Sequence, residues 1–274
     1  MKISITNIGF LPGVFAVTSD ANPIYTPIDM LDSDFNKRYV SQGIVTIFSM
    51  ELAPTTQDKD VSYVAIAGHN FGDVGGLLEV YVGSSPAPVV GSVQFEQGTR
   101  NNVVMITFPR VTTPEVIGIR FIKDDSKGQV LISNIQMGLT FDFVDPVNSA
   151  EPMGYKRIWL QQVSYARATI KQAAQPIKSE QERRANKMSL SIPNLQGDDF
   201  NIKRVPEHSN MYDFLFKISL DTLWYLKEYD GSSIVADNPR SSYLCFDTNM
   251  VMSAHSSTRA LNNMKLTFSA YTGI

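Results

Sequence analysis

Cysteine and histidine are scarce in this chain, and their scarcity excludes several kinds of site. The 274 residues contain one cysteine, Cys245, and three histidines, His69, His208 and His255. A single thiol cannot form an intramolecular disulfide or build a cysteine-based zinc site, so we expect Cys245 to be a small buried residue. No histidine lies at a short ligand spacing from another. We predict no metal site and no cofactor.

Motifs of catalysis are also missing. The chain has no GxSxG nucleophile elbow and no phosphate-binding P-loop. The acidic pairs 124–125 and 198–199 stand in turn-like segments, where adjacent side chains diverge and do not oppose each other as an acid and a base do. Asp29, Asp32 and Asp34 leave two alternatives, oxygen ligands for calcium or turn caps, and we favour caps because the EF-hand spacing is absent. We predict that the protein is not an enzyme.

A strong charge and a long apolar run are lacking as well. Lys and Arg number 24 against 27 Asp and Glu, for a net charge of −3. Without a basic field, binding to nucleic acid is not expected, since phosphate neutralisation supplies most of that affinity. No apolar run approaches the roughly 20 residues of a membrane helix, and the N-terminus does not resemble a signal peptide. We expect no membrane insertion and a protein made in the cytoplasm.

What the chain does contain is β-strand sequence. The segment 61–67 is an apolar run of strand length, the segment 68–72 is a polar loop with two glycines, and the segment 77–82 alternates apolar and polar residues. Further runs of this kind follow at short and fairly even spacing, which is typical of a β-sandwich or barrel. They cover residues 43–52, 92–95, 102–108, 116–122 and 129–135.

A change in composition divides the chain. Two prolines and a glycine fall within residues 145–154, and we place the domain boundary there, with domains 1–145 and 146–274. The second domain is expected to be β-rich, with a long hairpin over 160–192, one helix beginning near Asn210 and a strand within 222–229. Three more strands are expected at 240–246, 249–254 and 265–270. The predicted fold class is therefore mainly β, a β-sandwich followed by a β-rich domain with one helix.

The loop after the first strong strand contains the candidate site residues His69, Asn70, Phe71 and Asp73. Two interpretations stay open. Gly68 permits an unusual backbone turn, and the side chains of His69 and Asn70 can hydrogen-bond loop backbone, which makes this loop a structural corner. Alternatively, these residues line a shallow glycan-binding surface at the edge of the sandwich. We favour the structural corner.

The same residues carry a resemblance to a known family. The run 64–72 with its Gly-His-Asn step, followed by a strand at 78–81, resembles the "GHN" segment of galactose-binding-like, or discoidin-like, β-sandwich domains of tailed-phage virion proteins. Asn22-Pro23, Leu31-Asp32 and the strands at 45–48 and 117–121 fit this pattern, so the resemblance spans about 20–140. It implies a galactose-binding-like β-sandwich of jelly-roll type.

The resemblance also implies a function. The second half resembles, more faintly, β-rich domains of phage tail-tip and baseplate proteins. The implied protein is a non-enzymatic structural subunit of a bacteriophage virion, which forms a homo-oligomeric ring and contacts other tail subunits. The alternative is a carbohydrate-binding module that recognises a host-surface glycan, because relatives of the sandwich class often bind carbohydrate through loops at one end. The resemblance supplies no catalytic residue.

Overall fold

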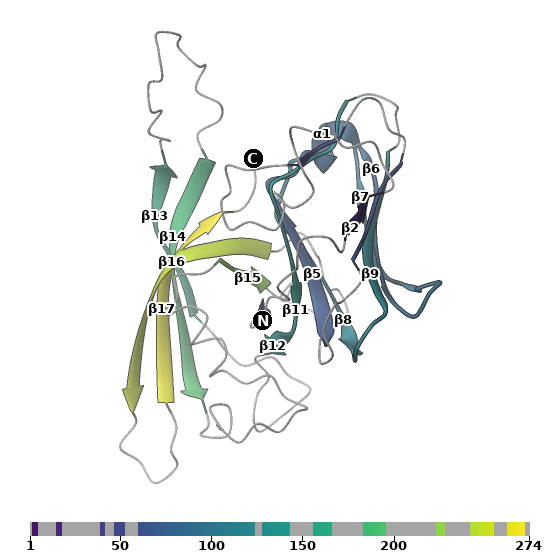
Figure 1. Cartoon of the computed structure of the whole chain (residues 1–274). Helices are drawn as coiled ribbons and strands as arrows, with labels where there is room; N and C mark the ends of the chain where they lie inside the picture. Colours follow the sequence, from purple (N-terminus) through teal and green to yellow (C-terminus); the bar gives the residue numbers. More distant parts are fainter. Residues whose placement is uncertain are drawn as a thin grey trace, which may run out of the picture.

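The computed structural model describes residues from both of the predicted halves (Figure 1). The described residues are 2–4, 15–17, 39–41, 47–52, 60–123, 128–142, 156–165, 183–195, 223–227, 242–254 and 262–271. Most of them lie in antiparallel strands, as the abundance of β-branched and aromatic residues predicts.

Two sheets face each other across a core in the first half. The larger sheet has the strand order β2-β4-β9-β6-β7 and the smaller one the order β11-β5-β8, while β3 and β10 form a separate pair. The strands of the larger sheet are β2 (Phe15–Val17), β4 (Ile47–Leu52), β9 (Val116–Lys123), β6 (Gly76–Gly83) and β7 (Val89–Phe95). The others are β11 (Asn134–Gly138), β5 (Val61–Ala67), β8 (Val104–Val111), β3 (Tyr39–Val40) and β10 (Leu131–Ile132).

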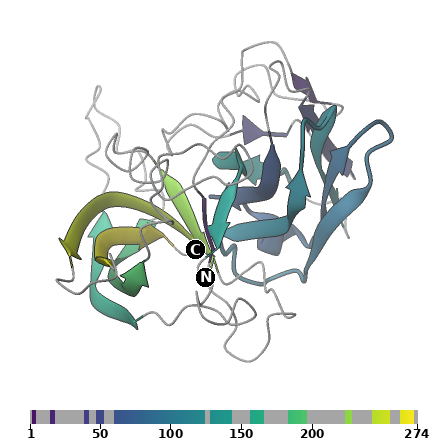
Figure 2. The same ribbon diagram turned by 90° about the horizontal axis from the view of Figure 1, so that it is seen from below.

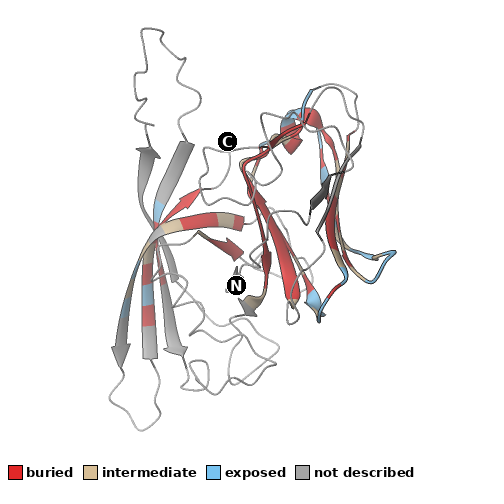
Figure 3. Ribbon diagram, viewed as in Figure 1, coloured by how far each residue is buried: buried red, intermediate tan, exposed pale blue. Residues whose placement is uncertain are grey.

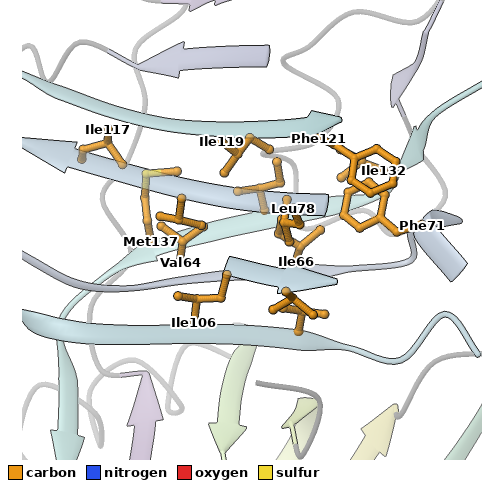
Figure 4. Packing of buried hydrophobic residues seen from close by; sticks show 14 of the residues in the cluster. Val64, Ile66, Phe71, Leu78, Ile106, Ile117, Ile119, Phe121, Ile132 and Met137 are labelled. Carbon is orange, nitrogen blue, oxygen red and sulfur yellow. The ribbon is translucent and has the colours of Figure 1, made fainter. Parts of the chain in front are cut away.

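The core of the sandwich follows from alternation along the strands. In β6 every second residue is buried, and Leu78, Val80 and Val82 point inward. They meet apolar side chains from β5, β8, β9 and β11, with Phe71 closing one end of the layer (Figure 4). Burial of this apolar surface is the main force that holds the two sheets together.

The strand β5 departs from the alternating pattern because both of its faces are covered. All seven of its residues are buried. Val64 and Ile66 belong to the sandwich core, whereas Tyr63, Ala65 and Ala67 pack in a second cluster with residues of the second half. A strand buried on both faces has a continuous apolar sequence, which is what the segment 61–67 shows.

A seven-stranded sheet supplies that second cover, in the order β12-β1-β15-β16-β17-β14-β13. The strands from the second half are β13 (Lys156–Tyr165), β14 (Arg183–Leu195), β15 (Trp224–Lys227), β16 (Ser242–Ala254) and β17 (Asn262–Tyr271). The first half contributes β1 (Lys2–Ser4) and β12 (Thr140–Asp142), so this sheet takes strands from both sides of the predicted boundary at 145. Seen from below, it lies to one side of the sandwich (Figure 2).

The predicted fold class is confirmed: the protein is mainly β and begins with a β-sandwich. The strand predicted within 222–229 is β15, and the predicted hairpin corresponds to the antiparallel pair β13 and β14. The helix expected near Asn210 lies outside the described residues. The described part contains one short helix, α1 (Phe71–Val74), where the sequence predicted only a bend. No helix among the described residues is long and apolar enough to span a membrane.

Candidate functional site

The predicted corner lies where β5 ends and α1 begins. Gly68 has a φ of 63°, a left-handed conformation that glycine adopts without steric cost, and it turns the chain out of β5. The backbone N–H of Ser133 donates to the carbonyl of Gly68 at 3.1 Å, so the turn is tied to the β10–β11 segment.

His69 is buried, with 5% of its surface exposed, and both ring nitrogens are used. Its Nδ1 accepts from the backbone N–H of Phe71 at 3.2 Å, which leaves the proton on Nε2 to be donated to the carbonyl of Asn102 at 2.7 Å. The ring stacks on Phe71 with a centroid distance of 4.4 Å and meets the ring of Phe95 edge-on. His69 therefore links the corner to the segment before β8.

Asn70 joins the corner to the segment around β10. Its amide nitrogen donates to the carbonyl of Gln129 at 2.7 Å, and its amide oxygen accepts from the backbone N–H of Leu131 at 2.8 Å. The backbone N–H of Asn70 also donates to the carbonyl of Leu131, at 3.3 Å. The side chain thus imitates one step of a strand ladder and satisfies backbone groups that the bend would otherwise leave unpaired.

Phe71 and Asp73 have opposite surroundings. Phe71 is fully buried and stacks on Phe121 at 4.3 Å between ring centroids. Asp73 is exposed, and its carboxylate accepts from the side-chain amide of Asn101 at 2.9 Å. The oxygen of the same amide accepts from the backbone N–H of Gly72 at 2.7 Å, so Asn101 fastens the first turn of α1.

The four predicted site residues are therefore brought together, but His69 and Phe71 are buried and Asn70 is half-buried. The polar groups of His69 and Asn70 are engaged with the backbone, and the ring of Phe71 lies in the core. Only Asp73 presents a charged group to solvent. The partners Asn101 and Asn102 could not be identified from the sequence, because they follow an unremarkable polar turn far along the chain.

Metal ligands are not gathered anywhere in the described part of the chain, where no group of three or more His, Cys, Asp or Glu residues could hold an ion. The calcium alternative at Asp29, Asp32 and Asp34 lies outside the described residues, as do the acidic pairs at 124–125 and 198–199 and the other two histidines. Cys245 is buried, as predicted.

The outer face of the five-stranded sheet is a second surface to consider. The outer face of the three-stranded sheet is covered by the second half, whereas side chains on the outer face of β6 and β9 are partly exposed (Figure 3). Tyr81 and Glu79 stand on this face in β6, directly opposite Gly118 and Arg120 of β9. Arg120 and Glu79 form an ion pair. Nothing in the local sequence marks these residues, since they come together only through strand register.

Comparison with known proteins gives structural likenesses only. No protein-family model matches the sequence, and no curated protein matches it significantly. The CBM32 module of AlyQ, solved in complex with 4,5-unsaturated mannuronic acid, is 17% identical with a TM-score of 0.37, over 47% of this chain and 95% of that one. Chitosan-binding module 1 of a chitosanase/glucanase from Paenibacillus sp. IK-5 is 12% identical with a TM-score of 0.38, over 48% of this chain and 98% of that one.

A larger protein is similar over one part. The GH29 fucosidase of Ruminococcus gnavus in complex with fucose is 15% identical with a TM-score of 0.40, over 50% of this chain and 27% of the fucosidase. Each of these likenesses covers about half of the present chain. Their identities and TM-scores are too low to assign a function to this chain.

Proposed function

We propose that this chain is a non-enzymatic recognition protein that binds carbohydrate on its β-sandwich half. The observation that carries the proposal is the partly exposed outer face of β6 and β9 in the five-stranded sheet, where the aromatic ring of Tyr81 lies beside the ion pair of Glu79 and Arg120. Sites for small polar ligands combine apolar or aromatic surface with a few placed polar groups, and this face has both.

The corner around His69 is the less suitable place for a glycan. A sugar bound there would have to compete with backbone groups for the ring nitrogens of His69 and the amide of Asn70. Breaking those hydrogen bonds would leave backbone groups unpaired, and for the buried N–H of Phe71 the cost is about 1–3 kcal/mol. The outer face of β6 and β9 is therefore the place of the glycan contact, and the corner is not.

A glycan array tests this function. The labelled full-length chain is expected to bind a subset of immobilised glycans, and Asp73→Asn is expected to bind the same subset with unchanged intensity. Silence across the array would contradict carbohydrate recognition. Because we propose no catalysis, a bound oligosaccharide should be recovered intact by chromatography after prolonged incubation, and the appearance of shorter saccharides would overturn that part.

A second candidate function is assembly into a bacteriophage virion, at the tail tip or baseplate, as a homo-oligomeric ring in contact with other tail subunits. The observation that favours it is a long strand at the edge of the seven-stranded sheet. The ten-residue strand β13 is its last strand and pairs, within the described residues, only with β14. A long edge strand is a template for a strand from a neighbouring subunit.

Mass photometry of the purified chain at micromolar concentration tests self-assembly. A ring would appear as one discrete multiple of the 30.5 kDa chain. A monomer alone would contradict self-assembly, and co-purification from phage-infected cells would then decide whether different tail subunits are the partners.

A further inference from the structure

Four residues on the outer face of the five-stranded sheet form a compact square. Tyr81 lies opposite Gly118, and Glu79 lies opposite Arg120, in one antiparallel pair of strands. Residues two apart in a strand are on the same face, separated by about 7 Å. An aromatic ring and an ion pair are thus held next to each other by backbone register and not by a mobile loop.

The ring of Tyr81 lies flat over strand β9 because Gly118 has no side chain. A Cβ placed on Gly118 would lie 2.2 Å from Cε2, 2.3 Å from Cζ and 2.7 Å from Oη of Tyr81. These three distances together require the Cβ to lie out of the ring plane, against one face of the ring. One face therefore rests on the strand and the opposite face points away from it, while the side chain as a whole is partly exposed.

The neighbouring ion pair uses only one carboxylate oxygen of Glu79. The Nε and Nη2 groups of Arg120 contact the same oxygen of Glu79, Oε2, at 2.7 Å and 2.5 Å. Within the described part of the chain, Oε1 of Glu79 and Nη1 of Arg120 have no partner. The side chain of Arg120 is 44% exposed and that of Glu79 is 15% exposed, so the pair offers further N–H donors at the surface beside the ring and a less exposed acceptor next to them.

We propose that these four residues are a subsite for an uncharged pyranose whose vicinal hydroxyls are equatorial. Such a sugar has C–H groups on both faces and hydroxyls around its rim. Its C–H face can lie on the outward face of the Tyr81 ring, while two neighbouring rim hydroxyls donate to Oε1 of Glu79 and accept from Nη1 of Arg120. The inference rests on the proposed carbohydrate function and names its site and ligand class.

The charge of the subsite favours a neutral sugar. The ion pair of Glu79 and Arg120 has no net charge, so it does not attract an anion or a cation over distance. A uronate carboxylate at the rim would meet the attraction of Arg120 and the repulsion of Glu79 together, so the pair does not compensate for the water that the carboxylate gives up on binding. Uronic acids should therefore bind less well than the corresponding neutral hexoses.

Saturation-transfer NMR of the full-length chain tests the subsite, with methyl β-D-glucopyranoside as the probe. Saturation should be strongest at H1, H3 and H5, which share one face of this sugar.

Loss of the ring face in Tyr81→Leu should weaken binding about tenfold, whereas Tyr81→Phe keeps the ring and should bind much as before. Gly118→Ala should also weaken binding, because the added methyl would displace the ring. The glucuronide of the same aglycone should bind more weakly than the glucoside.

Val251→Ser, at an exposed apolar position in β16, is the matched surface control and should leave binding unchanged. Equal saturation transfer in the wild type and a folded Tyr81→Leu variant would overturn the subsite. If the glycan array shows binding that Tyr81→Leu does not alter, the subsite is wrong and the carbohydrate function stands. If the array is silent, both the subsite and the carbohydrate function are contradicted.

Discussion

At the scale of single residues, the corner after β5 is held by side chains that replace missing strand partners. His69 is the clearest case, because it accepts from one backbone group, donates to another and stacks on Phe71. A histidine between two glycines resembles an active-site residue in the sequence alone. Its burial and its hydrogen bonds to backbone give it a structural task in this protein.

Substitution of His69 measures that task. His69→Ala removes two hydrogen bonds and a stacked ring from a buried place, so the free energy of unfolding should fall by about 2–4 kcal/mol. Urea denaturation measures the change, with Lys265→Ala at an exposed position of β17 as the control. Nitrogen NMR of the folded protein at neutral pH should show the proton on Nε2 and not on Nδ1. A stability loss below 1 kcal/mol would contradict the structural role.

Substitution of two glycines near this corner distinguishes the cost of lacking space for a side chain from the cost of an unfavourable backbone conformation. A Cβ on Gly72 would lie 2.3 Å from the carbonyl oxygen of Thr99, whereas a Cβ on Gly98 would meet nothing within 4 Å but would sit on a residue with φ of +83°. Gly98→Ala should therefore cost only about 1 kcal/mol of strain. Gly72→Ala forces backbone apart and should cost more, about 2–3 kcal/mol. Thermal denaturation of both variants gives the comparison, and the reverse order would refute the packing of α1 against this loop.

At the scale of elements, the sequence predicted the positions of the sandwich strands well, but it did not predict which distant segments contact one another. The strands β5, β6, β8 and β9 could be predicted because their apolar residues recur with a strand period or form one short run. The segment 129–135 was expected to be one strand, but Ser133 bonds to the corner and divides it into β10 and β11. Such a break depends on a contact 65 residues away in sequence, at Gly68, which no local pattern contains.

The same limit applies to the two candidate sites. The corner could be found from the sequence, since Gly68, His69 and Asn70 are adjacent and unusual. The square of Tyr81, Gly118, Glu79 and Arg120 could not, because its halves are about 40 residues apart and are matched only by the register of β6 with β9.

Substitutions in β8 should show that the outer face of the three-stranded sheet is covered by the second half. Met105 is fully buried against residues of the second half, although it points away from the sandwich core. Met105→Ala should therefore cost about 2–5 kcal/mol, as in an ordinary core. Ser92→Ala, on the exposed outer face of β7, should change stability by less than about 0.5 kcal/mol. Equal small effects in urea denaturation would mean that the second sheet does not cover β8 in solution.

At the scale of the whole molecule, the two halves are joined by shared structure and not only by a linker. The strands β1 and β12 extend the seven-stranded sheet, and Tyr63, Val103 and Met105 pack against Tyr225, Leu244 and Tyr271. Polar contacts cross the same junction, with Lys227 donating to the hydroxyl of Thr107 at 3.3 Å. An apolar junction of this kind makes us expect one cooperative unfolding transition, with coincident loss of tryptophan fluorescence and of amide protection in β5.

Tyr225 at this junction gives a pH-dependent test. Its hydroxyl donates to Oδ1 of Asn134 at 2.8 Å, and burial raises the pKa of Tyr225 well above its usual value, with smaller contributions from Tyr63, Cys245 and Tyr271. The unfolded chain therefore loses this proton first, near pH 10, while the folded chain retains it. The stabilising effect is complete below about pH 10 and declines above it, by up to about 1.4 kcal/mol per pH unit.

Comparison with Tyr225→Phe isolates this single group. At neutral pH the variant lacks the hydrogen bond to Asn134 and should be less stable than the wild type by about 1–2 kcal/mol. Because the variant has no proton to lose at this position, its stability should fall less steeply above pH 10, and the two curves of unfolding free energy should converge. Urea denaturation at a series of pH values measures both curves. A stability difference that stays constant from neutral pH to about pH 11 would mean that Tyr225 ionises as it does in water, and that the junction between the sandwich and the seven-stranded sheet admits solvent.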